Sequence, residues 1–176
     1  MGIKGGLHHQ ILYRNNVELI YEGHKGIGWN PPYFTLNGIE IPNEDYVEIH
    51  DDLFRRFHDY FNWIETYNPD GPKEFNKGFN HYGTTAMYGK NLMRFGNLID
   101  SLSNLFENAP EKVLLTGDFC FDSPLGNNTS SDCSTYRGHY ERVEVDRNEL
   151  IKIFRDLRMM TDRAIKNNGY LLHLGI

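Results

Sequence analysis

The segment LLTGDFCFD, from Leu114 to Asp122, contains side chains of the types that carry out chemistry. Its residues alternate between apolar and polar, which predicts a half-buried β-strand with the polar side chains on one face. Asp118, Cys120 and Asp122 share that face, and carboxylates and thiols bind metal ions or transfer protons. Aspartate is also disfavoured inside strands, so two of them on one face point to a role beyond structure.

Histidines in two later segments are candidates to complete such a site. His139 and Glu141 fall on one face of the predicted strand HYERVEVD, and His173 lies in the final apolar segment. If these strands lie beside the Asp118 strand, the imidazoles and carboxylates converge as in a metal protein or an acid–base enzyme. One interpretation is therefore an enzyme or metal-binding protein that uses Asp118, Asp122 and His139, with His173 as a further candidate.

The simpler interpretation is that this face is the solvated side of an ordinary strand. In that case Asp122 begins the following loop, and Cys120 packs as a small residue. We favour this interpretation, because spacing alone does not show that side chains converge. The sequence therefore leads us to predict no catalytic residue, no metal site and no cofactor.

Established motifs of catalysis and cofactor binding are missing from the chain. It has no Walker A sequence, no nucleophile elbow, no HExxH and no paired CxxC. The glycines of GHKGIG, residues 23–28, are not spaced as in a dinucleotide-binding loop, so we expect them to serve turns. The eight histidines include no i, i+4 pair that would place two ligands on one helix face.

The charge of the chain is concentrated in one window. The net charge is −6 at pH 7, and residues 40–74 hold ten acidic residues against three basic ones. This block argues against nucleic-acid binding in that window, since phosphates bind to positive surfaces. It is either a solvated face that keeps the protein soluble or a docking face for a basic partner.

The function that we favour from the sequence is that of a small acidic inhibitor or interaction protein, of the immunity-protein, antitoxin or phage anti-defence type. Carboxylates would steer a partner with a basic surface, and aromatic side chains would anchor it. The predicted partner-binding residues are Glu44, Asp45, Glu48, Asp52, Asp59 and Trp63. An enzyme or metal-binding protein is the first alternative. A structural or assembly subunit, with exposed aromatic residues buried in copies of itself, is the second, and the oligomeric state stays open.

The composition is that of one globular domain. The chain has 176 residues, of which 39% are hydrophobic and 24% charged, enough for a full apolar core. No apolar stretch has the length of a signal peptide or membrane span, so we expect a cytoplasmic protein without a membrane partner. Cys120 and Cys133 are expected to be free thiols in that compartment. The last helix has a basic face, but the acidic domain argues against a nucleic-acid partner.

Two hairpins and the first two helices are predicted from turn residues and apolar spacing. Asn15-Asn16 and Asn37-Gly38, each between alternating runs, predict β-hairpins within residues 10–42. Apolar residues at i, i+3, i+4 spacing predict helices over about 51–67 and 90–108. Asp51 or Asp52 is expected to cap the first of these helices. The segment 70–89 has no clean period and is predicted to be a long, aromatic-rich loop.

The rest of the chain completes a single α+β domain over residues 1–176. Strands are predicted over about 113–121 and 139–145, then a helix over 147–167 capped by Asp146, with a left-handed stop at Asn168-Gly169. The final strand, 170–175, is apolar on both faces, which favours a place inside a sheet. We therefore predict a largely antiparallel sheet with about three helices packed mainly on one face. The last two strands either pair in parallel through the helix or are separated by another strand.

Overall fold

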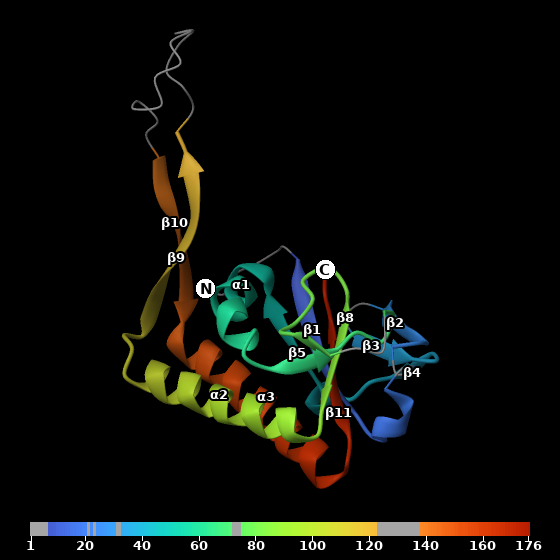
Figure 1. Ribbon diagram of the computed structural model, residues 1–176. Coiled ribbons are helices and arrows are strands. Elements are labelled where there is room, and N and C mark those ends of the chain that lie inside the picture. The colour runs from blue at the N-terminus through green and yellow to red at the C-terminus, as the bar shows by residue number, and fades with distance from the viewer. Residues whose placement is uncertain (1–6, 21, 23, 31–32, 72–74, 123–137) are drawn as a thin grey trace, which may run out of the picture.

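A six-stranded antiparallel sheet forms the centre of the protein (Figure 1). The computed structural model describes residues 7–20, 22, 24–30, 33–71, 75–122 and 138–176. The strand order is β5-β1-β11-β8-β6-β7, and every neighbouring pair is antiparallel. These strands are β1 (His8–Arg14), β5 (Tyr46–His50), β6 (Glu65–Tyr67), β7 (Phe75–Lys77), β8 (Thr84–Tyr88) and β11 (Tyr170–Leu174).

Two smaller antiparallel sheets complete the β-structure. One contains β2 (Ile27–Asn30), β3 (Tyr33–Leu36) and β4 (Ile39–Glu40). The other is a ribbon of only two strands, β9 (Lys112–Phe121) and β10 (Gly138–Asp146).

Three helices form the main core together with one face of the central sheet. They are α1 (Asp51–Phe61), α2 (Lys90–Glu107) and α3 (Arg147–Lys166), and α2 and α3 lie side by side (Figure 1). Two short 3₁₀ helices, η1 (Val17–Leu19) and η2 (Asn43–Asp45), lie in connections. The predicted α+β fold, with three helices and a largely antiparallel sheet, is confirmed.

The alternation of side chains along the strands separates the two faces of the sheet. Ile11 of β1 and Leu171 of β11 belong to the core that contains the helices. Their neighbours Leu12 and Leu172 lie in separate buried clusters on the opposite face. Phe34 of β3 packs in the same cluster as Leu12, so the small β2–β3–β4 sheet covers part of that face.

The first predicted hairpin is wrong and the second is confirmed. Asn16 has a positive φ of 69°, but its side chain accepts a hydrogen bond from the Glu18 N–H and begins η1 instead of a second strand. The partners of β1 are β5 and β11, which lie far along the chain. Asn37 and Gly38, with φ of 51° and 81°, do join β3 to β4.

The region after α1 differs most from the prediction. The helix ends at Phe61 instead of residue 67, and residues 65–67 form β6. The predicted loop over 70–89 contains β7 and β8, and β8 pairs with both β11 and β6. Thr85, Ala86 and Met87 are buried there. Their pairing with distant strands outweighs a weak local pattern.

The ends of two helices show which capping predictions are correct. Asp146 caps α3, since its carboxylate accepts from the N–H groups of Asn148 and Glu149. Asn168 ends it with a positive φ of 49°, and the Gly169 N–H donates to the Ala164 carbonyl. At α1 the prediction of an aspartate cap is wrong. The imidazole of His50 accepts from the Asp52 N–H and is the cap.

The final strand lies inside the central sheet, as predicted. β11 is between β1 and β8 and is antiparallel to both. β10 belongs to the two-stranded ribbon, so the two last strands do not form the parallel unit that the sequence left open. Within the described ranges, no helix is both long and apolar enough to cross a membrane.

Candidate functional site

The two-stranded ribbon of β9 and β10 projects from the body of the protein (Figure 1). We call this ribbon the arm. Its base is fixed in the main core by Val113, Val143 and Val145, which are buried among the helices. Beyond the base, most residues of both strands are exposed. The arm therefore presents side chains away from the body while its base is held rigidly.

A β-bulge divides the arm at Gly117. Thr116 pairs with Arg142 and Phe119 pairs with Tyr140, so Gly117 and Asp118 together face the single residue Glu141. A Cβ atom on Gly117 would lie 2.5 Å from the Glu141 Cβ, which explains the glycine. The bulge interrupts the simple alternation that the sequence suggests for β9. Leu115, before it, packs against the core, whereas Phe119 and Phe121, after it, are exposed.

Three aromatic rings gather on the part of the arm beyond the bulge. The ring of Phe119 lies edge-on to the ring of Phe121, with centroids 5.1 Å apart, and to that of Tyr140, with centroids 5.0 Å apart. The exposed fractions of Phe119, Phe121 and Tyr140 are 43%, 68% and 60%. We call these residues the arm ring cluster. The sequence pattern does not distinguish these residues, although a glycine inside a strand is a recognised signal of a bulge.

Asp118 holds the arm against the start of α1. One of its carboxylate oxygens lies 2.7 Å from the Arg55 guanidinium, and the other lies 3.3 Å from that of Arg56. The hypothesis that Asp118 acts with Asp122 and His139 rests on spacing along the sequence alone. The structure places Asp118 in this ion pair with two arginines instead of beside an imidazole.

The other two residues of that hypothesis do lie together. The Nδ1 atom of His139 lies 3.1 Å from the Asp122 carboxylate, and both side chains are more than half exposed. Within the described part of the chain, no third histidine, cysteine or carboxylate joins this pair to form a ligand group. An exposed pair of this kind can exchange a proton, but among the described residues it lacks the further ligand that a metal site requires.

The thiol of Cys120 is occupied by its neighbour across the arm. Its Sγ donates a hydrogen bond to the Glu141 carboxylate, with an S–O distance of 3.4 Å. That hydrogen bond is the main cause that raises the pKa of Cys120, and partial desolvation adds to it. A higher pKa disfavours the reactive thiolate. Cys120 is a free thiol, and Cys133 lies outside the described residues.

His173 lies far from the arm in the interior of the central sheet. It is fully buried on β11, and its Nε2 atom lies 2.9 Å from the Nδ1 atom of His9 on β1. Burial lowers the pKa of His173 well below its ordinary value. The convergence of His173 with Asp118 and Asp122, which required neighbouring strands, does not occur because β9 and β11 belong to different sheets.

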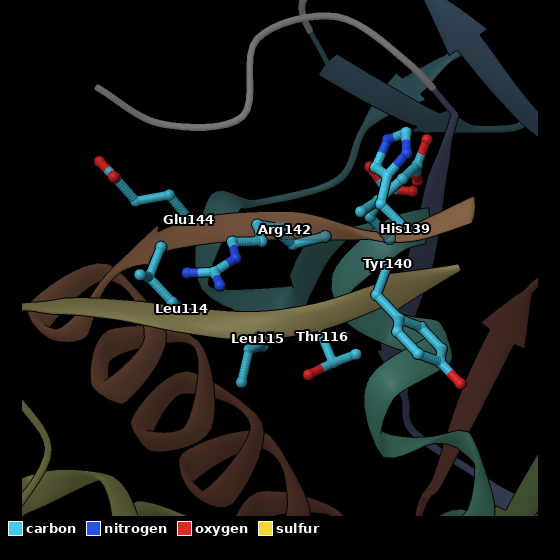
Figure 2. A pocket seen from close by; sticks show the side chains of 10 residues that line it. Leu114, Leu115, Thr116, His139, Tyr140, Arg142 and Glu144 are labelled. Atoms are coloured by element: carbon cyan, nitrogen blue, oxygen red, sulfur yellow. The ribbon is translucent and has the colours of Figure 1, made fainter. Parts of the chain in front are cut away.

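A hollow of about 1100 Å³ runs along the arm beside the first turn of α1 (Figure 2). We call it the arm groove. Asp52 lines it from α1, and the remaining lining residues come from β9 and β10, including Glu141, Arg142 and Glu144. Figure 2 shows the side chains of His139 and Tyr140 projecting to opposite sides of β10. Tyr140 lines the arm groove and is also a member of the arm ring cluster.

Charges along the arm groove are mostly negative. Asp52, Glu141 and Glu144 contribute carboxylates, and Arg142 contributes a guanidinium. Lys112 already pairs with Glu144 at 2.8 Å. That pair raises the pKa of Lys112 and lowers the pKa of Glu144. The remaining carboxylates of Asp52 and Glu141 favour a cationic group over an anionic one in the groove.

The acidic block of the sequence is partly neutralised inside the protein. Of its ten acidic residues, Glu74 lies outside the described residues. Five others lie against a basic side chain or a histidine: Asp45, Asp51, Asp52, Glu65 and Asp70. The last four, Glu40, Glu44, Glu48 and Asp59, form no ion pair within the described part of the chain.

The predicted partner-binding residues are distributed over two sides of the central sheet. Glu48 alternates with Val47 and Ile49, which face the helices, so Glu48 lies on the opposite face. Asp45, the last residue of η2, is paired with Arg163 of α3, and burial raises the pKa of its carboxyl group.

Asp52 and Asp59 lie on α1, and Asp52 lines the arm groove. Trp63, just after α1, is 68% exposed and lies edge-on to Tyr60, with ring centroids 5.4 Å apart. Glu44 is exposed on η2. Of the six predicted residues, Asp52 is therefore the one that the arm groove includes.

Comparison with protein-family models, with curated proteins and with solved structures finds no match to this chain.

Proposed function

We propose that this protein binds a partner protein with a basic surface, and that the arm ring cluster and the arm groove form the binding surface. The observation that carries the proposal is the contact of the Phe119 ring with the rings of both Phe121 and Tyr140, while the three residues still expose 43%, 68% and 60% of their surface. Monomeric proteins seldom expose clustered apolar groups without a binding role. Phe and Tyr are also enriched among interface residues.

The shape of the arm supports protein binding. Its base is anchored by Val113, Val143 and Val145, so the rings are presented on a rigid strand pair and little conformational entropy is lost on binding. Asp118, in the bulge, ties the arm to Arg55 and Arg56. Both contacts hold the cluster in one orientation relative to α1.

Charge indicates the type of partner. The carboxylates of Asp52 and Glu141 line the arm groove, and Asp122 lies beyond Phe121 at the end of β9. Negative groups on the same arm as the apolar anchors attract a basic protein and repel nucleic acid. If the partner is an enzyme with a basic cleft, occupation of that cleft by the arm makes this protein an inhibitor of the immunity-protein, antitoxin or anti-defence type.

Affinity capture with two matched variants tests the proposal. The ring variant carries Phe119→Ser, Phe121→Ser and Tyr140→Ser. The control carries Met93→Ser, Leu105→Ser and Met159→Ser on α2 and α3, where the side chains are 56%, 65% and 56% exposed. Both variants lose three exposed apolar side chains, but only the first loses those of the arm.

The expected result is one protein retained in comparable amounts by the wild type and the control, and at least tenfold less by the ring variant. Its retention should weaken as the salt concentration rises, because charge contributes to the complex. Equal retention by the ring variant would contradict the proposal. If light scattering shows that the wild type associates with itself through the rings, the arm is an assembly surface between copies of this chain.

A further inference from the structure

Three side chains from separate segments converge at the N-terminal end of α1. His9 comes from β1, Asp51 is the first residue of α1, and His81 lies in the connection between β7 and β8. The same Oδ1 atom of Asp51 lies 3.1 Å from the His9 Nε2 atom and 3.2 Å from the His81 Nε2 atom. The three ligand-type atoms all lie within 4.8 Å of one another.

These distances suit a single metal ion. Zinc bonds to nitrogen and oxygen of about 2.0–2.2 Å place two ligand atoms of one tetrahedral ion about 3.3–3.6 Å apart. Two of the three pairs, at 3.1 and 3.2 Å, lie just below that range. An ion that binds all three side chains therefore requires these two pairs to separate by about a few tenths of an ångström.

The surroundings of His9 are those of an oriented metal ligand. Its ring stacks on Phe54, with centroids 3.9 Å apart and an interplanar angle of 13°. Its second nitrogen, Nδ1, lies 2.9 Å from the His173 Nε2 atom. Metal-binding histidines typically use their second nitrogen in a hydrogen bond that fixes the tautomer and the ring orientation. His173 is fully buried, and its other nitrogen, Nδ1, has no hydrogen-bond partner among the described residues.

The site opens on one side to a hollow of about 490 Å³. Asp51 and His81 line this hollow, and His9 lies behind them, fully buried. The other polar side chains that line it are those of Arg55, His58, Asp59 and Tyr82. Three protein ligands with an open fourth position are the arrangement of a site that also binds water or a small ligand.

We propose that His9, Asp51 and His81 bind one divalent transition-metal ion, with zinc as the representative ion. Two imidazoles and one carboxylate favour such an ion over magnesium or calcium, which prefer oxygen ligands. On binding, the His9 and His81 Nε2 atoms coordinate the ion. The His9 Nδ1–H then donates to His173. The Asp51 carboxylate provides the negative charge, and the fourth position faces the hollow.

A purely structural network, in which both histidines donate hydrogen bonds to Asp51 and no metal ion binds, would show the same contacts. The two possibilities differ in a measurable way, because only a metal site gains affinity and stability from added metal. This readout does not involve the arm or a partner, so its outcome is independent of the proposed function.

His81→Ala and His24→Ala form a matched pair for the test. Each wild-type imidazole approaches one aspartate through its Nε2 atom, His81 at 3.2 Å from Asp51 and His24 at 2.8 Å from Asp70, and each side chain is 21% exposed. Asp51→Asn is a second site variant that keeps the side-chain shape. His139→Ala controls for zinc bound by the exposed pair of His139 and Asp122.

Calorimetric titration of chelator-treated protein with zinc chloride should show one ion per chain. His81→Ala and Asp51→Asn should weaken binding at least tenfold, whereas His24→Ala and His139→Ala should leave it unchanged. Zinc should raise the midpoint of thermal unfolding of the wild type and both controls but not of the two site variants. Cobalt(II), used as a coloured probe, should give the visible absorption of a low-coordinate complex in the wild type and not in His81→Ala.

The proposal is overturned if folded His81→Ala binds zinc as the wild type does, or if the wild type binds no zinc in stoichiometric amount.

Discussion

The carboxylate of Asp118 on β9 lies 2.7 Å from the guanidinium of Arg55 on α1. Arg56 approaches the other oxygen of the same carboxylate at 3.3 Å. This contact joins the arm to the body at the bulge, between the buried base and the arm ring cluster. It therefore determines how the rings are presented relative to α1 and the arm groove.

Loss of this contact should loosen the arm without unfolding the protein. In Asp118→Asn, amide hydrogen exchange of residues 118–121 and 138–141 should accelerate. The free energy of unfolding should fall by less than about 1 kcal/mol, because Asp118 and its nearer partner Arg55 are 45% and 42% exposed and exposed ion pairs contribute little. Asp100→Asn, which removes an exposed carboxylate 3.5 Å from Arg158, is the control. Unchanged exchange in the arm would show that Asp118 does not hold it.

Asp52 should affect the rate at which the partner binds. Reversal of its charge in Asp52→Lys removes a carboxylate that lines the arm groove, so association with a basic partner should slow while dissociation changes little. The effect should shrink at high salt, since a charge on the rim acts through screened electrostatics. Stopped-flow or surface-binding kinetics measure both rates. Asp100→Lys on α2 makes the same change elsewhere, and an equal slowing in that variant would rule out a local role for Asp52.

Cys120 should become more reactive when Glu141 loses its charge. The hydrogen bond to the Glu141 carboxylate is the main cause of the raised pKa of Cys120. In Glu141→Gln the pKa should fall, the thiolate fraction at pH 7.5 should rise, and iodoacetamide should label Cys120 severalfold faster. Peptide mass spectrometry distinguishes Cys120 from Cys133. Glu144→Gln on the same strand should leave the rate unchanged, and slower labelling in Glu141→Gln would refute the assigned cause.

Stability should fall in mildly acidic solution because of two buried histidines. Burial lowers the pKa of His173 and of His9 below the ordinary value of 6.5. Asp51, His81 and His58 lie around them, and the His9–Asp51 hydrogen bond opposes part of the shift of His9. Below pH 6.5 the unfolded chain binds protons that the folded protein does not. The stability that depends on the two neutral histidines is therefore fully present above that pH and is lost as the pH falls below it.

Denaturant unfolding at a series of pH values, in the presence of a chelator, measures this loss. Each histidine contributes at most about 1.4 kcal/mol per pH unit. His173→Phe should reduce the slope between pH 6.5 and 5, and His24→Ala should not. A wild-type stability that is constant over this range would contradict the prediction.

Local signals in the sequence predict the three helices, except for the end and the cap of α1, and they do not predict several of the strands. The caps of α3 at Asp146 and Asn168 depend on neighbouring residues, so the pattern predicts them correctly. β8 owes its place in the sheet to β11 and β6, which lie far from it in sequence. No short window contains that information.

The candidate sites show the same limit. The sequence predicts the alternation of β9, and strict alternation would place Phe119 and Phe121 beside Leu115. The bulge at Gly117 instead exposes both rings. His9, Asp51 and His81 come from three distant segments, so their convergence follows only from the order of the strands. The expected grouping of His173 with Asp118 failed for the same reason.

Site-specific photo-cross-linking tests the role of the arm most directly. A benzophenone amino acid is placed at Phe121, in the arm ring cluster, or at Leu105 on α2, where the exposed fractions are 68% and 65%. After irradiation in native-host lysate, the account predicts one dominant adduct with a basic protein at Phe121 that is missing at Leu105 and is lost when Asp52→Lys is added. No adduct at Phe121, or the same adducts at both positions, would contradict it.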